Sequence, residues 1–183
     1  SYRGNVGRVA PNIINRNFVP KTPNSKWATD VTQIKIASVK LFFSPILDMF
    51  NGEIIAYNIS RTPNLAHVYD MLEKAFSQFD FLEGLILHSD QGWQYQHYGY
   101  RKRLAERGVI QSMPRKGNCL DNAMMENFFG IMKSELLYAE KFNPPEEFVK
   151  ALEEYIVYYN NERIKSRLKG KSPVQYRTLS QSN

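Results

Sequence analysis

The chain has 183 residues, which suits one domain with a sizeable core, and its 43% hydrophobic and 13% aromatic content excludes an intrinsically disordered chain. No apolar stretch approaches the roughly 20 residues that cross a bilayer and no signal peptide is visible, so we expect no membrane partner. The single cysteine, Cys119, excludes an internal disulfide and a cysteine-based metal cage, and it fits a reducing cytoplasm.

The net charge of +6 is spread unevenly along the chain. Residues 1–26 carry five basic residues and no acid, residues 160–183 again net +5, and the part between them therefore nets −4. Basic ends around an acidic centre favour a polyanion that the flanks grip while central carboxylates hold cations. The alternative is that the ends are merely solubilising or disordered tails.

The charge pattern divides the chain into a basic arm or linker over residues 1–26, a core over 27–160 and a basic C-terminal tail over 161–183. Ser1 in place of methionine suggests a piece of a longer protein. The arm is expected to pack against the core through its few apolar residues, Ile13, Ile14, Phe18 and Val19.

The residues that follow the arm have the pattern of β-strands, and Asp30 lies on the first of these strands. Two further strands, over 41–49 and 53–59, flank Asn51-Gly52. Asn-Gly is the strongest short hairpin signal, because both turn positions need positive φ. A proline inside the second strand, Pro45, predicts an edge or a bulge.

Helices and strands then alternate. Apolar spacing, caps and turn residues predict strands over 84–89 and 109–111 and helices over 64–79, 95–107, 120–138 and 143–159. The pattern indicates an α/β protein with a five-stranded mixed sheet, three antiparallel strands followed by two parallel ones, flanked by helices. Right-handed crossovers place the fourth strand beside the first.

Three acidic residues stand out in this arrangement. Asp90 ends a buried apolar strand, where open α/β sheets place their ligands, and the expected strand order puts Asp30 on its neighbour. Glu126 would reach in from a helix. Three adjacent carboxylates repel one another, which hard divalent ions such as Mg²⁺ or Mn²⁺ relieve. For Asp90 taken alone, the alternative is a capping or turn aspartate.

The helix that carries Glu126 has a narrow polar stripe. Asn122, Gly130 and Lys133 share a face with Glu126 because they are four or seven residues away from it. A stripe that ends in a lysine favours contact with a phosphate backbone, and a solvated helix face is the alternative.

Other polar residues are candidates for supporting roles. His88 either orients the Asp90 carboxylate or is a satisfied strand-end histidine. Phosphate contacts that do not read sequence are expected from a loop and from the tail, namely from Arg115, Lys116, Asn118, Arg163, Lys165 and Arg167.

The spacing and the sequences of these motifs resemble those of a known family. Between the acidic residues lie 59 and then 35 residues, and an interval of 35 is a hallmark of the DDE transposases and retroviral-type integrases. The chain is similar to second-frame (OrfB) transposases of bacterial insertion sequences in the IS-three family from about residue 12 to 177. The motifs that carry this likeness are Trp27 to Thr32, His88 to Gly92, Lys116-Gly117-Asn118, Asp121-Asn122-Ala123, Glu126 to Phe129 and Tyr159 to Arg163.

The resemblance implies a ribonuclease H-like fold and metal-dependent cleavage and transfer of DNA strands at insertion-sequence ends. It implies two Mg²⁺ or Mn²⁺ ions per site, with Asp30 bridging both while Asp90 and Glu126 each complete one shell. It also implies contact of Lys133 with DNA ends, homo-oligomers on transposon-end and target DNA, and a bacterial cytoplasm, nucleoid-associated on DNA. The alternatives are a ribonuclease H-like nuclease without strand transfer and an inactive DNA-binding remnant.

Overall fold

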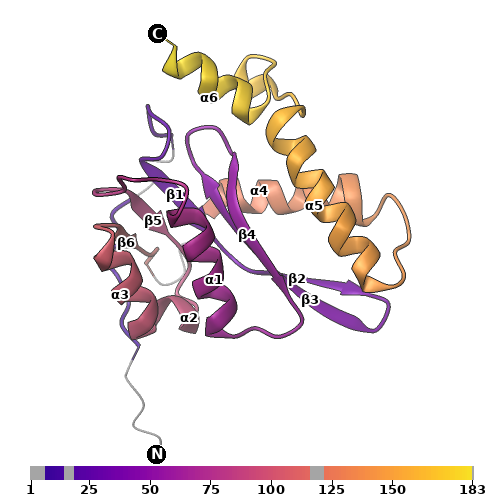
Figure 1. Ribbon diagram of the computed structural model, residues 1–183, viewed down its shortest axis with the longest axis horizontal. Helices are drawn as coiled ribbons and strands as arrows, with labels where there is room; N and C mark the ends of the chain where they lie inside the picture. Colours follow the sequence, from indigo (N-terminus) through magenta and orange to yellow (C-terminus); the bar gives the residue numbers. More distant parts are fainter. Residues whose placement is uncertain (1–6, 15–18, 116–121, 183) are drawn as a thin grey trace, which may run out of the picture.

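The computed structural model describes residues 7–14, 19–115 and 122–182, in which one mixed sheet has helices on both faces (Figure 1). The strands are β1 (Lys26–Thr29), β2 (Thr32–Ile36), β3 (Val39–Asp48), β4 (Ile54–Ser60), β5 (Ile86–His88) and β6 (Ile110–Ser112). The α-helices are α1 (Leu65–Phe76), α2 (Trp93–Gln96), α3 (Tyr98–Glu106), α4 (Ala123–Met132), α5 (Pro145–Asn161) and α6 (Pro173–Gln181). A π-helical turn, η2 (Lys133–Leu137), extends α4, and a 3₁₀ turn, η3 (Ser166–Leu168), precedes α6.

The strand order confirms the expected mixed α/β sheet. β3 pairs antiparallel with β1, β2 and β4, whereas β5 is parallel to β1 and β6 is parallel to β5. The fourth strand along the predicted chain, β5, therefore lies beside the first. This order brings the carboxyl ends of β1 and β5 together at one place on the sheet.

The sheet has six strands rather than five because the first predicted strand is interrupted at Asp30. The register with β3 continues across the gap, since Thr29 pairs with Ile46 and Thr32 with Phe43. Asp30 is therefore opposite a proline, which has no N–H to donate. The Val31 N–H donates to the Asp30 carboxylate over 2.8 Å, so the interruption coincides with the acidic residue.

The Asn51-Gly52 turn is where the structure corrects the expected hairpin. Of these two residues, only Gly52 has a positive φ, of 80°. The strands end at Asp48 and resume at Ile54, so the loop is longer than two residues. Side chains explain the longer loop: Asn51 Oδ1 accepts the Glu53 N–H, and Asn51 Nδ2 donates to a carbonyl of the C-terminal segment. The proline in β3 does lie next to a bulge, a register shift after Ile46, but in an interior strand.

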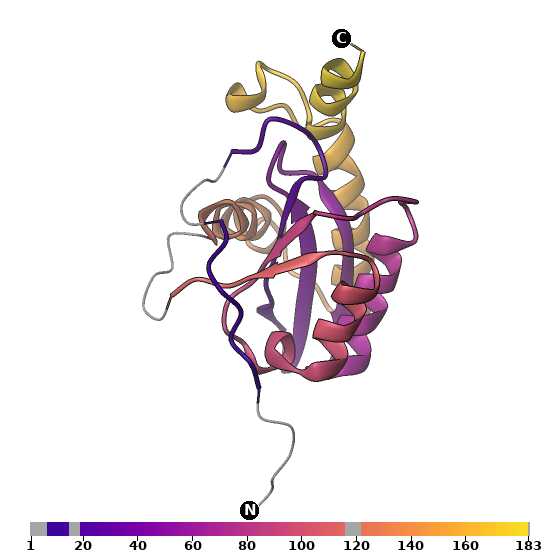
Figure 2. The ribbon, with the colours of Figure 1, turned by 90° about the vertical axis from the view of Figure 1, so that its left-hand side faces the viewer.

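Helices lie on both faces of the sheet (Figure 2), and an apolar core fills the space beneath them on each face. On one face, α1 and α3 pack over Trp27 and Ile46, and on the other, α4 and α5 pack over Phe43. Phe43 lies 6.2 and 6.1 Å, between ring centroids, from Phe128 and Phe129 of α4. Burial of each such ring contributes about 1.5–3 kcal/mol, so the apolar side of α4 is anchored and its polar side faces outward.

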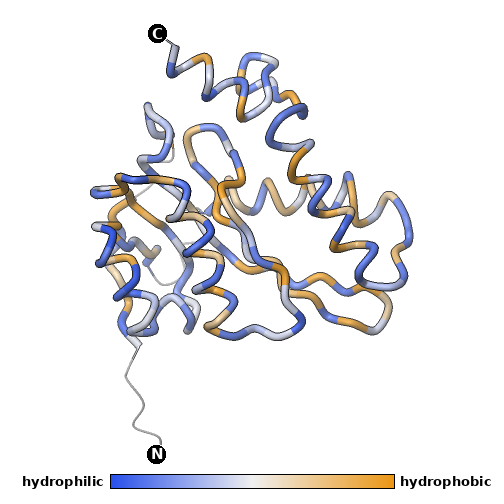
Figure 3. Tube along the Cα trace, viewed as in Figure 1, coloured by the Kyte–Doolittle hydropathy of each residue, from blue (hydrophilic) through white to orange (hydrophobic). Residues whose placement is uncertain are grey.

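The terminal segments lie against this core, and the C-terminal one is largely hydrophilic along its trace (Figure 3). α6 packs on the turn between β3 and β4, where Arg177 Nε lies 2.9 Å from Glu53 Oε2. In the arm, Ile14 is buried as expected, but Ile13 and Val19 are exposed, and Phe18 lies outside the described residues. No helix in the described ranges is long and apolar enough to cross a membrane.

Candidate active site

The first two acidic residues meet at the carboxyl ends of two parallel strands. β1 and β5 pair with an offset that sets Trp27 beside Leu87 and Ala28 beside His88. Continued by two residues, the same offset sets Asp30 beside Asp90, at the roughly 4.8 Å that separates neighbouring strands. The two side chains interact by a hydrogen bond and by charge.

The environment of Asp30 disfavours its charged form. Burial raises its pKa to about 7, the Val31 N–H opposes that rise, and the charges of Asp90 and Glu126 add to it. Desolvation and like-charge repulsion both penalise an ionised carboxylate unless a cation is present. Near neutrality this carboxyl is therefore divided between its protonated and its charged form.

Glu126 reaches the pair from the start of α4. It lies on the exposed side of the first turn, where a carboxylate complements the helix dipole. The stripe expected on this helix faces β1 and β2: Asn122 Nδ2 lies 3.5 Å from Asp30 Oδ2, and Lys133 Nζ donates to Thr32 Oγ1 over 2.9 Å. The helix is therefore tied to Asp30, between β1 and β2, at one end of the stripe and to Thr32 of β2 at the other.

The three carboxylates are near one another without forming a closed cage. Within the described ranges, no three His, Cys, Asp or Glu side chains form a group that could hold a metal ion as they stand. Asp30 contacts Asp90 directly, whereas Glu126 acts on Asp30 through charge. The donors are nonetheless all carboxylate oxygens, the ligand type that Mg²⁺ and Mn²⁺ prefer, so the chemistry of the set fits a hard divalent ion.

A short turn after β5 holds Asp90 in place. Asp90 Oδ1 accepts the Gly92 N–H over 2.8 Å, and Gln91 donates to the Pro114 carbonyl over 3.0 Å. A Cβ added to Gly92 would lie 2.9 Å from Asp90 Oδ1, too close for a stable contact. Gly92 is a supporting residue that the sequence analysis did not single out, although a glycine two residues after a strand-end aspartate was the available signal.

His88 is fully buried, and its Nδ1 bonds to the next strand, not to Asp90. Nδ1 lies 2.9 Å from Ser112 Oγ, which also accepts the N–H groups of Ile13 and Ile14. A hydroxyl that accepts twice has one proton left to donate. The Ser112 hydroxyl can therefore donate that proton to His88 Nδ1. The structure thus ties His88 to β6 through Ser112, and both readings of its role stay predictions.

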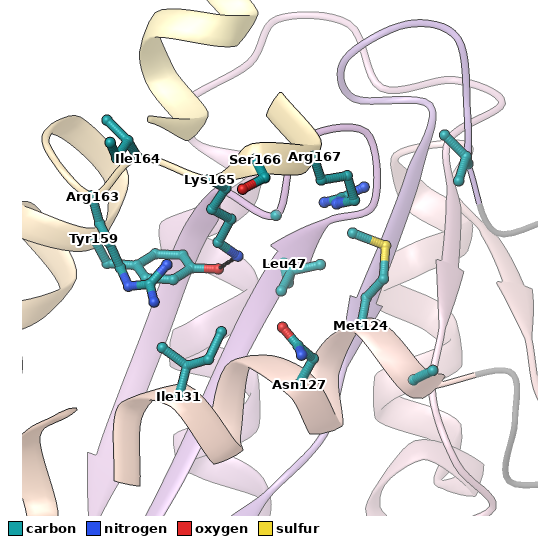
Figure 4. Close-up of a pocket in the computed structure, with 13 residues that line it drawn as sticks. Leu47, Met124, Asn127, Ile131, Tyr159, Arg163, Ile164, Lys165, Ser166 and Arg167 are labelled. Atoms are coloured by element: carbon teal, nitrogen blue, oxygen red, sulfur yellow. Dashed lines mark hydrogen bonds between the residues drawn. The ribbon is translucent and has the colours of Figure 1, made fainter. Parts of the chain in front are cut away.

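The remaining candidates fall into two groups. Arg115 is exposed at the edge of the described chain, and Lys116 and Asn118 lie outside the described residues. The three tail residues, Arg163, Lys165 and Arg167, do not join the carboxylates but line a separate pocket beside α4 (Figure 4).

A mixed sheet with neighbouring strand-end aspartates and a helix-borne glutamate defines a ribonuclease H-like domain. Two models of the family described as "Integrase core domain" match the chain, over residues 20–119 and 126–180. This chain belongs to the integrase core domain family, in the branch of the insertion-sequence transposases, which confirms the resemblance.

The relatives include bacterial insertion-sequence proteins. The chain is 52% identical over 182 residues to an uncharacterized transposase-like protein of Haemophilus influenzae, covering 98% of this chain and 83% of that protein. It is 49% identical over 177 residues to a putative transposase InsK for insertion sequence element IS150 of Escherichia coli, covering 97% of this chain and 62% of that protein. The chain thus spans under two thirds of the second relative's length.

Solved structures show the same fold at low sequence identity. A chain of the simian T-cell lymphotropic virus intasome matches with a TM-score of 0.72 and 16% identity, covering 95% of this chain and 60% of that one. The HTLV-2 integrase catalytic core domain in complex with magnesium matches with a TM-score of 0.68 and 17% identity, covering 86% of this chain and 98% of that one. These matches confirm the ribonuclease H-like fold.

Proposed function

We propose that the chain is the catalytic core of a DDE transposase that cuts DNA at insertion-sequence ends and transfers the freed strand to target DNA. Asp30, Asp90 and Glu126 are the proposed metal ligands. The observation that carries the proposal is the direct contact of Asp30 with Asp90, with Glu126 close enough to act on the same carboxyl. Kinship with insertion-sequence transposases supports it.

The proposed cofactor is a pair of Mg²⁺ or Mn²⁺ ions per site. A structural neighbour was solved with magnesium, and the all-carboxylate donor set suits these ions. When bound, such ions activate the attacking oxygen and stabilise the leaving oxygen of a phosphodiester. Asp30, Asp90 and Glu126 would hold these ions.

The chain's own residues would then position the DNA. Asn122 holds α4 against Asp30 and Lys133 holds it against Thr32, and these residues would offer an amide and an ammonium group to the DNA backbone. Further backbone contacts are proposed for Arg115, Lys116, Asn118, Arg163, Lys165 and Arg167. A neighbour from an intasome supports assembly as a homo-oligomer on transposon-end and target DNA.

The test is Asp90→Asn, which keeps an oxygen to accept the Gly92 N–H but removes the charge. We expect loss of Mn²⁺-dependent nicking with DNA binding retained, and the exposed Asp80→Asn variant is the matched control. Undiminished nicking by Asp90→Asn would refute the role of Asp90. A pre-cleaved 3′ end offered with a target duplex separates a transposase, which joins the strands, from a nuclease, which does not.

A further inference from the structure

A pocket of about 640 Å³ lies beside α4, and neither Asp30 nor Asp90 lines it (Figure 4). Its apolar wall comes from Leu47, Met124 and Ile131. Its polar side chains come from α4, from the end of α5 and from the residues around η3, and the turn between β3 and β4 adds Gly52. The polar residues are Asn127, Tyr159, Arg163, Lys165, Ser166 and Arg167.

The polar groups converge at one point, next to Gly52. A Cβ added to Gly52 would lie 3.4 Å from Tyr159 Oη, 3.6 Å from Lys165 Nζ and 3.7 Å from Arg167 Nη2. Lys165 Nζ also donates to Tyr159 Oη and lies 4.6 Å from the centroid of the Tyr159 ring. The absence of a side chain at Gly52 therefore leaves room at the place where two cationic groups and a hydroxyl meet.

Two of the three cations that line this pocket are not balanced by carboxylates within the described residues. Arg163 is paired with Glu135, with 2.5 Å between Nε and Oε1. Lys165 and Arg167 form no ion pair with any carboxylate in the described part of the chain. Burial, with the charges of Arg167 and Arg163, lowers the pKa of Lys165 to about 8. Like charges held together in a half-buried site are costly unless an anion joins them.

We infer that this pocket binds a phosphate group, and that the group is a backbone phosphodiester of the DNA strand that reaches the carboxylates. The Arg167 guanidinium offers paired N–H donors, and Lys165 adds a point charge. Tyr159 accepts from Lys165, so its own proton is free to donate to a phosphate oxygen. The site positions DNA without reading its sequence.

The assignment to DNA rests on the proposed function and on the place of the pocket. Its wall includes Asn127, the residue after Glu126, so the pocket and the carboxylates occupy adjacent flanks of the same helix. A strand laid across α4 would pass from one to the other. Free phosphate compounds share the chemistry, so the test must separate the two sources.

The test uses Arg167→Gln and Lys165→Gln, with Lys150→Gln on the exposed side of α5 as the matched control. The first measurement is the melting temperature in inorganic phosphate against chloride at equal ionic strength. The second is the affinity for a DNA duplex from 50 to 300 mM NaCl. Each pocket variant should lose the stabilisation by phosphate and lower the slope of log K against log salt by about 1, whereas Lys150→Gln should change neither.

The outcomes separate the claims. Unchanged phosphate stabilisation and an unchanged salt slope in both variants would overturn the site. Lost phosphate stabilisation with an unchanged slope would overturn the DNA assignment in favour of a free phosphate compound. Lys165→Arg should restore part of the slope, which guards against a variant that merely misfolds. If the wild type bound DNA through this pocket but never nicked it, the proposed function would fail while the pocket stood.

Discussion

Gly92 supports the carboxylate of Asp90 through its backbone and through its lack of a side chain. Its N–H donates to Asp90 Oδ1 over 2.8 Å, and an added Cβ would lie 2.9 Å from the same oxygen. The other atom that a Cβ would meet at 2.9 Å is the end of the Gln94 side chain. Both neighbours are side-chain ends that can move, so a larger residue would displace the carboxylate more than it would disturb the fold.

We therefore predict that Gly92→Ala lowers the nicking rate by about tenfold to a hundredfold, the scale of a small misplacement of a catalytic group. The free energy of unfolding should change by less than about 1 kcal/mol. The stabilisation by Mn²⁺ should fall in parallel with the rate. The matched control is Gly130→Ala, where an added Cβ meets nothing within 4 Å, and there the Mn²⁺ effect should persist. Wild-type activity in Gly92→Ala would contradict the role.

Asp48 is a buried carboxylate outside the active site that should make stability depend on pH. It is fully buried and accepts the N–H groups of Asn24 and Phe50 at 2.8 and 3.0 Å. Burial raises its pKa from 3.8 to about 6 against those two bonds. Between the two values the folded state binds more protons than the unfolded state, so the free energy of unfolding falls as the pH rises.

A pKa of about 6 in the folded state, against 3.8, corresponds to about 3 kcal/mol of pH-dependent free energy of unfolding. Relative to Asp48→Asn, the wild type should lose about that much of its free energy of unfolding between pH 4 and pH 7. Urea unfolding of both proteins in metal-free buffer measures the difference in their free energies of unfolding. The contributions of the other titrating groups cancel in this difference. Stability curves that run parallel across this range would contradict the assignment.

At the scale of elements, the sequence predicts what depends on local pattern. Within the described residues, the helix expected over 120–138 corresponds to α4 with η2. The prediction succeeds because the apolar residues that indicate the helix are the ones that anchor it in the core. The buried strand before Asp90 is found as β5, although it is shorter, Ile86–His88, than the expected 84–89. The pairing of Asp30 with Asp90 also follows from pattern, since strand order and register can be reasoned from alternating strands and helices.

What the sequence does not predict depends on contacts between distant residues. The turn after β3 departs from the expected hairpin because Asn51 binds the Pro173 carbonyl, 122 positions away. The phosphate pocket escapes prediction for the same reason, since Gly52 lies far from Tyr159 and Lys165 in the sequence. Lys165 and its neighbours were expected to contact DNA, but nothing local to them indicated a pocket.

The contact of α6 with the β3–β4 turn gives a prediction for this pair of elements. The side chains of Glu53 and Arg177 are 11% and 30% exposed and bond through Arg177 Nε and Nη2 at 2.9 and 3.2 Å. Arg177→Met should lower the free energy of unfolding by about 2 kcal/mol, because it leaves the Glu53 carboxylate buried without its partner. The double variant Glu53→Gln with Arg177→Met should lose less than Arg177→Met alone. Simple additivity in urea unfolding would show that the pair is not coupled.

At the scale of the whole molecule, the uneven charge of the sequence has a structural counterpart. The basic C-terminal segment folds back so that Lys165 and Arg167 line a pocket on one flank of α4, while Glu126 projects from the adjacent flank toward Asp30. Under the proposed function, cations would hold the DNA backbone on one side of the helix, and carboxylates would hold metal at the reacting phosphate on the other. The two charge regions then act on one strand without neutralising each other.

The acidic side of this arrangement gives a test that requires no DNA. A ligand that binds only the folded state at 100 times its dissociation constant adds about 2.7 kcal/mol to the free energy of unfolding. For a chain of 183 residues this corresponds to a rise in melting temperature of about 5–10 °C. We expect Mn²⁺ to produce such a rise in the wild type and in Asp80→Asn, and to produce little or none in Asp30→Asn, which lacks the charge shared between the ions. An equal rise in Asp30→Asn would place the metal elsewhere, and no rise in the wild type would mean that the three carboxylates do not gather a cation without DNA.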